Sequence, residues 1–552
     1  MASKIEGYKK NSQYLRGRLA EELSDQSQPT VSEETRQLLK FHGVYAQDDR
    51  DLRRQRQRAR EPLAHSFMAR LALPGGRLGA AQYLAIDDIM NQLELPSLRL
   101  TSRQSIQLHG IEKPHLRDTL KNLNHSLVST LAGCGDVERN LMCCPVPSRD
   151  PLRQDLEHWT AVLSATLRPQ TRAYAELWID GDKAWSSAEA EDVEPLYGPT
   201  YLPRKFKTAI ALEGDNCVDI FSQDLGLVAH PGRDGTIDAF TVLVGGGLAK
   251  SHGVEATHAR LAEPLATVSA GQVVALATAI VTVQRDFGNR EDRRYARLKY
   301  LVEKWGLSRF QATVRERLDF DLDRPRPLHF GPLDDHLGWH PVDSQTGYIG
   351  LHVANGRIQD SGPVRVRTGL RRLIERYQPE IVITPQQNLI LTGLPLDCES
   401  QVHALLTQFD IAVPSSPMVR MAMACPALPT CGLAITESER VFGDVLAKIQ
   451  AIWESLGMGQ RPLQVRMTGC PNNCARSFMA EIGFVGRSLN SYTVYVGGRD
   501  NGTQLNRLYA ENIKLEHLVD TVQPLLEHYA EEHQAEESFG EFCQRLVLPA
   551  LV

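Results

Sequence analysis

The chain lacks several features that would point to other classes of protein. Its formal net charge is −6, so no global basic field indicates nucleic acid, and any anion site must be local. Its longest apolar stretch, Val273 to Val283, is too short to cross a bilayer and predicts a buried helix. The N-terminal segment MASKIEGYKKNSQYLRG contains no apolar signal core. We therefore expect a cytoplasmic protein.

Cysteine is the most informative residue type that is present. Ten cysteines in a chain with no export signal are typical of thiols and ligands rather than disulfides. Four of them form a C-x5-C pair, Cys425 and Cys431 in ACPALPTC, and a C-x3-C pair, Cys470 and Cys474 in TGCPNNC. Four thiolates at this density require a metal centre or disulfides. A helical i,i+4 placement would put the sulfurs of Cys470 and Cys474 on one face.

The spacing of these cysteines favours one kind of metal centre. Structural zinc usually takes a tighter C-x2-4-C knuckle, so the wider first pair points to an iron–sulfur cluster held by four thiolates. Such a cluster stores and passes single electrons, which indicates redox chemistry. The alternative is a binding protein without catalysis, in which zinc or a cluster only stabilises the fold.

An internal duplication predicts the architecture. The 552 residues are enough for three or more cores, and RLTSRQSIQLHGI, from Arg99, returns as VITPQQNLILTGL, from Val382. The turn Gly76-Arg77-Leu78 is echoed by Gly356-Arg357-Ile358, and FTVLVGG, from Phe240, by YTVYVGG, from Tyr492. The order is A-B-A′-B′, with the halves meeting near residue 300.

Local patterns predict an α+β fold with antiparallel or mixed sheets. Residues 99–110 and 492–498 read as strands, and residues 437–456 have apolar side chains at helical spacing. The charged segment 48–62 predicts a solvated arm or helix laid over the other half.

Two segments concentrate positive charge. Alternation along the first A strand places a polar, cationic set on one face, namely Thr101, Arg103, Ser105, Gln107 and His109. The matching face of the second copy is neutral, as expected when only one half of a duplicated scaffold holds an anionic ligand. In TYLPRKFKTAIAL, from Thr200, we expect a strand with Lys205 and Lys207 on one face and Arg204 on the other. Adjacent cations repel one another unless an anion or solvent compensates them.

Together these strings resemble the sulfite and nitrite reductase haemoprotein family, and most of all its NADPH-dependent branch. The resemblance runs over nearly the whole chain and is carried by RLTSRQSIQLHG, RNLMC, TYLPRKFKT, LVGGGL, QRDFGNR, ACPALPTC, RMTGCPNNCAR and RLYAENI. It implies a three-lobed, pseudo-twofold α+β protein with mixed and antiparallel sheets flanked by helices. The implied divisions are an N-terminal arm (1–63), a first ferredoxin-like repeat (64–135), a first sirohaem-binding domain (136–325), a second ferredoxin-like repeat (326–412) and a second sirohaem-binding domain with the cluster (413–552).

The resemblance also implies two cofactors and their ligands. A [4Fe-4S] cluster would be held by Cys425, Cys431, Cys470 and Cys474. A sirohaem would take Cys474 as its proximal iron ligand, so that one sulfur joins both cofactors. Residues matching the family's cofactor-binding positions are Arg103, Gln107, His109, Arg204, Asn472 and Cys474. Residues matching the positions around the distal anion are Arg70, Arg139, Lys205 and Lys207.

The implied reaction is the six-electron reduction of sulfite to sulfide. Guanidinium groups would bind the sulfite oxygens, and ammonium groups would donate protons as S–O bonds break. Lys207 indicates sulfite over nitrite, because nitrite-specialised members commonly carry an uncharged residue there. Nitrite is then a secondary substrate.

The electron donor is also an expectation from the resemblance. RLYAENI and YLRG favour a diflavin NADPH reductase with FAD and FMN as partner, and a ferredoxin-fed sulfite or nitrite reductase is the alternative. No G-x-G-x-x-G fingerprint is evident, so this chain itself needs no nicotinamide site.

Two departures from the family's strings stand out. Asn473 occupies a position where glycine is commoner, and asparagine is the least costly substitute if φ is positive there. Cys134, Cys143 and Cys144 have no implied ligand role, so buried or available thiols are the expectation for them.

Overall fold

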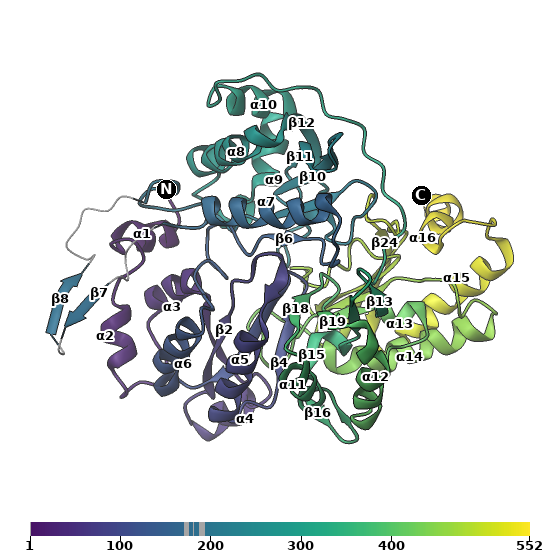
Figure 1. The fold of residues 1–552 in the computed structure, drawn as a ribbon, viewed down its shortest axis with the longest axis horizontal. Coiled ribbons are helices and arrows are strands. Elements are labelled where there is room, and N and C mark those ends of the chain that lie inside the picture. Colours follow the sequence, from purple (N-terminus) through teal and green to yellow (C-terminus); the bar gives the residue numbers. More distant parts are fainter. Residues whose placement is uncertain (1, 171–175, 180–181, 187–193, 552) are drawn as a thin grey trace.

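A computed structural model describes residues 2–170, 176–179, 182–186 and 194–551 of the protein. In these ranges the chain forms four five-stranded sheets and two small two-stranded ones. Figure 1 shows three lobes: one around α8 and β10–β12, one around β2–β5 and β18–β19, and one around α14–α16. None of the described helices is both long and apolar enough to cross a membrane.

Two of the large sheets are antiparallel copies of each other. The first has the order β1 (Val44–Asp48), β2 (His65–Arg70), β5 (Ser105–Ile111), β4 (Leu98–Thr101), β15 (Arg357–Ile358). The second has the order β13 (Gly338–Pro341), β14 (Thr346–Leu351), β19 (Leu389–Pro395), β18 (Glu380–Ile383), β3 (Arg77–Leu78). The order shows that each sheet ends in a short strand donated by the other half of the chain. These donated strands, β3 and β15, are the repeated Gly-Arg-Leu and Gly-Arg-Ile segments.

Glycine is required where each donated strand begins. Gly76 has φ +76°, and a Cβ there would lie 2.5 Å from the carbonyl oxygen of Ile383. Gly356 has φ +72°, and its Cβ would lie 2.5 Å from the carbonyl oxygen of Leu100. The two copies therefore make the same backbone approach in opposite directions.

The other two large sheets are mixed and also match. The first has the order β12 (Glu263–Ser269), β11 (Ile237–Val244), β10 (Leu225–Pro231), β9 (Thr208–Leu212), β6 (Met142–Cys143). The second has the order β20 (Met423–Ala424), β21 (Val465–Thr468), β22 (Ile482–Ser488), β23 (Ser491–Val496), β24 (Arg507–Lys514). In each, the first three strands along the chain run parallel and the last two antiparallel. The predicted A-B-A′-B′ duplication and the α+β class are confirmed.

Helices cover these sheets. The larger ones are α5 (Ala80–Gln92), α6 (Lys113–His125), α7 (Pro151–Leu167), α8 (Val273–Phe287), α9 (Leu298–Trp305), α10 (Leu307–Arg315), α11 (Val366–Tyr377), α12 (Glu399–Gln408), α14 (Glu439–Ser455) and α15 (Leu518–Glu532). The shorter ones are α1 (Lys4–Asn11), α2 (Leu19–Ser24), α3 (Glu33–Leu39), α4 (Arg53–Ala59), α13 (Pro417–Met421) and α16 (Phe539–Phe542). One core spans residues 15–411, and a second lies within residues 418–548. The helices predicted from 273–283 and 437–456 are confirmed as α8 and α14.

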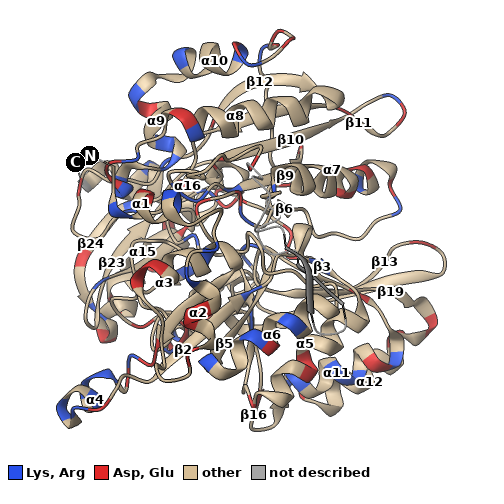
Figure 2. Ribbon diagram, turned by 90° about the vertical axis from the view of Figure 1, so that its left-hand side faces the viewer, with Lys and Arg blue, Asp and Glu red and all other residues tan. Residues whose placement is uncertain are grey.

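The start of the charged segment 48–62 contacts the second half, as predicted, whereas its helix projects from the molecule (Figure 2). This helix, α4, buries no side chain. Just before it, the backbone nitrogen of Arg50 donates to the carbonyl of Pro429 (3.1 Å). The guanidinium of Arg50 donates to the carbonyl oxygens of Cys431 and Ala434, both at 3.0 Å. The first half therefore braces the loop that carries Cys431.

Three local predictions were wrong. The strand predicted over 99–110 is a hairpin of β4 and β5, because the chain turns at 102–104. The strand predicted from Thr200 begins only at Thr208, so Arg204, Lys205 and Lys207 lie in an irregular segment. Residues 470–474 form turns rather than a helix, since Asn473 has φ 59°. That angle confirms the expectation for asparagine at this position.

Candidate cofactor and substrate pocket

Parallel strands bring the two cysteine pairs together. Cys425 follows β20 and Cys470 follows the neighbouring strand β21, so the C-terminal ends of both strands meet at one edge of the sheet. The amide of Cys425 donates to the carbonyl of Met467 (3.2 Å). The amide of Gly469 donates to the sulfur of Cys425 (3.3 Å). These bonds fix the cysteine loops against each other.

The four sulfurs differ in exposure. Cys425 and Cys470 are buried, Cys431 is half-buried, and Cys474 is exposed. Burial, followed by the charge of Cys474, raises the pKa of Cys425 to about 12. The same two causes raise the pKa values of Cys431 and Cys470. Three of the four sulfurs thus stay protonated at neutral pH unless a metal replaces the protons.

The sulfurs are too widely spaced to bind one ion together. Among the described residues, no three of Cys425, Cys431, Cys470 and Cys474 have sulfurs within 4.8 Å of one another. A single tetrahedral zinc with four thiolates would hold its sulfurs about 3.8 Å apart, given Zn–S bonds of about 2.3 Å. The four thiols are therefore not arranged as in an assembled four-thiolate zinc site.

The exposed Cys474 opens into a small pocket of about 30 Å³. The pocket is lined by Ser102, Arg103, Met142, Lys207, Ser222, Gln223, Leu248, Ala249, Arg297, Asn472, Asn473, Cys474 and Arg476. Of the predicted site residues, Arg103, Lys207, Asn472 and Cys474 lie on its wall. Ser102, from the β4–β5 turn, donates to the carbonyl of Cys474 (2.7 Å), which ties the first half to the cysteine loop.

Lysines beside this pocket carry unbalanced charge. In the described chain no carboxylate forms an ion pair with Lys205 or Lys207. Burial, and next the charge of Lys207, lowers the pKa of Lys205 well below its usual value. Burial, followed by the charges of Arg103 and Arg297, does the same to Lys207. Such groups favour an anionic ligand and release protons readily.

The arginines predicted to hold a cofactor are partly engaged with the protein. Arg103 donates to Gln223 Oε1 (2.8 Å) and to the carbonyl of Asn140 (2.6 Å), but its buried Nε has no partner. Burial lowers the pKa of Arg103 to about 10. Arg204 forms no ion pair within the described residues, and burial lowers its pKa to about 10 as well.

The remaining predicted residues are not among those that line the pocket. Arg70, on β2, pairs across the sheet with Gln107, on β5, whose side-chain oxygen can accept from Arg70 Nε at 3.0 Å. Burial opposes the charge of Arg70, but its interactions with Cys134, Tyr45 and Cys474 raise its pKa. His109 Nδ1 lies 3.0 Å from Gln47 Oε1.

His109 and Arg139 complete this second set. Burial and neighbouring arginines lower the pKa of His109 well below its usual value, so it is neutral at physiological pH. Arg139 Nε donates to the carbonyl of Gly135 (2.8 Å). The charge of Arg139 helps to lower the pKa of Lys205, so the two side chains lie close enough to repel each other.

Comparison with known proteins identifies the family. Residues 158–322 match the nitrite and sulphite reductase 4Fe-4S domain, and residues 61–126 and 341–408 match the nitrite/sulfite reductase ferredoxin-like half domain. The sulfite reductase (NADPH) hemoprotein beta-component of a Paenibacillus species is 40% identical over 545 residues, covering 98% of this chain and 95% of the relative. The chain belongs to the nitrite and sulfite reductase family. The protein of the same name from Chromohalobacter salexigens is 43% identical, covering 99% of this chain and 96% of the relative.

The solved structure of Mycobacterium tuberculosis NirA protein shares the fold of this family member. Its TM-score is 0.78 at 22% sequence identity, covering 98% of this chain and 95% of that chain. The two ferredoxin-like matches coincide with the two antiparallel sheets. The 4Fe-4S domain match falls on the first mixed sheet, whereas the four-cysteine centre lies beside the second. In this reductase the duplicated domain therefore carries the four cysteines in only one copy.

Sequence reasoning missed several pocket residues. Arg297 reaches the pocket from the loop before α9 and is held by Asp224 through bonds of 2.6 and 3.0 Å. Arg476 follows Cys474 by two residues and donates to the carbonyl of Pro385 (2.6 Å), while its Nη1 is buried without a partner. The position of Arg476 inside RMTGCPNNCAR could have revealed it. Arg297 carries no local signal, because only the tertiary fold brings it to the site.

Proposed function

We propose that this chain is the haemoprotein component of an assimilatory, NADPH-type sulfite reductase, which reduces sulfite to sulfide with six electrons. One observation carries the proposal. The exposed sulfur of a four-cysteine centre, Cys474, opens into a pocket whose wall also bears Arg103, Lys207 and Arg297. An electron store and a cationic anion site thus meet at a single atom.

The donor set fits a [4Fe-4S] cluster on Cys425, Cys431, Cys470 and Cys474. Thiolate is the ligand that such clusters take, and the ends of β20 and β21 bring the two cysteine pairs together. The hydrogen bond from the Gly469 amide to the Cys425 sulfur is of the kind that tunes the reduction potential of a cluster.

The donor groups of the pocket wall also suit a macrocycle rich in carboxylates. Two buried guanidinium nitrogens have no hydrogen-bond partner in the described chain, namely Arg103 Nε and Arg476 Nη1. Both can donate to the carboxylates of a bound cofactor. When bound, sirohaem would supply the substrate-binding iron, and the cluster would supply single electrons. We assign sirohaem contacts to Arg103, Gln107, His109, Arg204 and Asn472, with Cys474 as the shared ligand.

The chain's own residues then handle charge and protons. Arg70, Arg139, Lys205 and Lys207 are proposed to face the substrate anion. The guanidinium groups hold sulfite oxygens through charge-assisted bonds. The Nζ groups of Lys205 and Lys207, whose pKa values are lowered by burial and by neighbouring cations, donate protons to departing oxygens.

Electrons are proposed to come from a diflavin NADPH reductase, in the cytoplasm, because the relatives are named as NADPH-dependent beta-components. Ferredoxin is the alternative donor. Reduction of the purified holoenzyme by each donor in turn distinguishes the two, and reduction by ferredoxin alone would overturn the diflavin assignment.

The function is tested first at Cys474. The purified holoenzyme should show tetrapyrrole absorption bands, iron and acid-labile sulfide, and should release sulfide from sulfite under a chemical reductant. Cys474→Ser should lose sulfite turnover, while Cys398→Ser, at a buried thiol between β19 and α12, should retain it. A wild-type protein with full iron but no tetrapyrrole would refute the proposal.

Lys207 tests the choice of anion. Lys207→Asn should reduce kcat/KM for sulfite roughly 100-fold, as expected for loss of a proton donor, and should reduce nitrite turnover less. Lys121→Asn, at an exposed position on α6, is the control and should change neither. Equal losses for the two anions would show that Lys207 does not select between them.

A further inference from the structure

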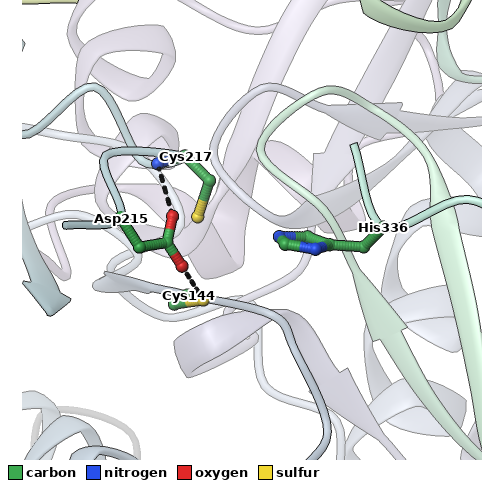
Figure 3. A group of neighbouring side chains, drawn as sticks. All are labelled: Cys144, Asp215, Cys217 and His336. Carbon is green, nitrogen blue, oxygen red and sulfur yellow. Dashed lines mark hydrogen bonds between the residues drawn. The ribbon is translucent and has the colours of Figure 1, made fainter. Parts of the chain in front are cut away.

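A second group of potential metal ligands lies apart from the four-cysteine centre. It consists of Cys144, Asp215, Cys217 and His336, and one ligand atom of each lies within 4.8 Å of those of the other three. Figure 3 shows the four side chains converging from separate segments. Cys144 follows β6, Asp215 and Cys217 lie in the loop after β9, and His336 precedes β13. Within the described residues no other such group of three or more is this close.

The histidine presents a free nitrogen to this group. His336 is 5% exposed, and its Nδ1 lies 3.4 Å from the carboxylate of Asp334. Its Nε2 is buried and has no hydrogen-bond partner in the described chain. A ring with one nitrogen beside a carboxylate and the other facing sulfur ligands has the orientation of a metal-bound histidine.

Hydrogen bonds already connect Cys144, Asp215 and Cys217. The thiol of Cys144 donates to Asp215 Oδ2 (2.8 Å), and Asp215 Oδ1 accepts from the amide of Cys217 (3.1 Å). Cys217 is fully buried. Arg153, in the first turn of α7, donates to the Cys144 sulfur (2.9 Å) and lies 3.7 Å from Asp215 Oδ2.

We infer that these four side chains form a zinc site. Two thiolates, an imidazole and a carboxylate are ligands that zinc takes in tetrahedral geometry, with ligand atoms about 3.3–3.8 Å apart. Binding replaces the thiol protons, which leave to solvent. Two thiolates and a carboxylate around a divalent ion leave one net negative charge, which the guanidinium of Arg153 neutralises.

The ligands are held in place by both halves of the chain. Asp335, beside the histidine, pairs with Arg420 through two bonds of 2.6 Å. The carbonyl of Cys217 accepts from Gln386 (3.0 Å), in the β18–β19 turn. Because Cys144, Asp215 and Cys217 belong to the first half and His336 to the second, the ion would join the two halves.

The test measures zinc in the intact holoenzyme. Protein with full iron and labile sulfide is exposed to Zn²⁺, passed over a chelating resin and analysed for metal. We expect about one tightly held zinc per chain, and a zinc X-ray absorption spectrum with about two sulfur and two lighter ligands. Because iron and visible bands are read on the same sample, failure here is distinct from failure of the proposed function.

Two substitutions and a matched control locate the ion. Cys217→Ser and His336→Gln should each lose the zinc, whereas Cys143→Ser, at the buried thiol next to Cys144, should keep it. All three should keep their iron. The proposal would be overturned if Cys217→Ser retained zinc or if the wild type bound none. It would also be overturned if Cys144 and Cys217 were recovered as a disulfide after alkylation of free thiols. The spectrum of the wild type decides the matter even if a variant does not fold.

Discussion

Glu439 provides the most quantitative test of how the two halves hold the cysteine centre. It begins α14, and its carboxylate accepts from Arg357 Nε (2.7 Å) and Nη2 (2.8 Å) and from Arg99. Arg99, on β4, is 1% exposed. The amide of Glu439 donates to the carbonyl of Cys425 (3.1 Å). Glu439 thus links β4 and β15 through its carboxylate, and Cys425 through its backbone amide.

Replacing Glu439 by Gln leaves two arginines, one fully buried, without a counter-charge. Breaking a buried pair by removing one partner costs about 3–5 kcal/mol. Glu437, two residues earlier in the chain, offers a matched control. Its ion pair with Arg440 is more exposed, since the Arg440 side chain is 44% exposed. Loss of such a pair costs about 0–1 kcal/mol.

The assay is urea unfolding of the holoenzyme, followed by tryptophan fluorescence, to which Trp453, buried on α14, contributes. Glu439→Gln should lower the midpoint well beyond Glu437→Gln, with an unchanged slope, and should speed iron release below the midpoint. Arg99→Met should cost less than Glu439→Gln, because Glu439 keeps Arg357. Equal midpoints for Glu439→Gln and Glu437→Gln would refute the reasoning.

Two further predictions concern other parts of the chain. Buried Asp136 pairs with Arg293 (2.7 Å) and Lys9 (3.5 Å); burial opposes its ionisation, but these cations hold its pKa below the usual value. The stability that its charge contributes is therefore complete above about pH 4 and is lost as the pH falls further. Asp136→Asn should destabilise the protein by about 3–5 kcal/mol near neutrality and should flatten the acid side of a plot of unfolding free energy against pH. An acid side parallel to that of the wild type would contradict the lowered pKa of Asp136. Gly486→Ala would place a Cβ 2.5 Å from the carbonyl oxygen of Gly469 and should lower the iron content of the protein. The control, Gly443→Ala, has nothing within 4 Å of the new Cβ and should stabilise α14 by up to about 1 kcal/mol. Equal iron content in both variants would show that this close approach does not affect the cysteine centre.

Much of the fold could be predicted because the chain repeats itself. Repeated strings fixed the order of the units, and helical spacing located α8 and α14. Strand limits could not be predicted in the same way. Alternation continues through residues 102–104, where the chain in fact turns and Gln104 has φ 51°. A turn without glycine or proline gives no local signal.

The candidate site could be predicted only where its residues lie in compact motifs. The four cysteines and Lys207 stand in short, distinctive strings. Arg297 and the ligand group around His336 come from positions far apart in sequence, and only the packing of loops brings them together. Pairing of buried charges, such as Arg297 with Asp224, is likewise invisible before the fold is known.

The exchanged strands β3 and β15 have a consequence for how the two copies could have arisen. Each copy completes the other's sheet with a backbone segment that it does not use itself. A single-copy ancestor with this arrangement would have to exist as a twofold dimer whose subunits traded edges. Fusion of such a pair makes this exchange permanent within one polypeptide, and it allows one copy to keep the thiolates while the other supplies most of the cations.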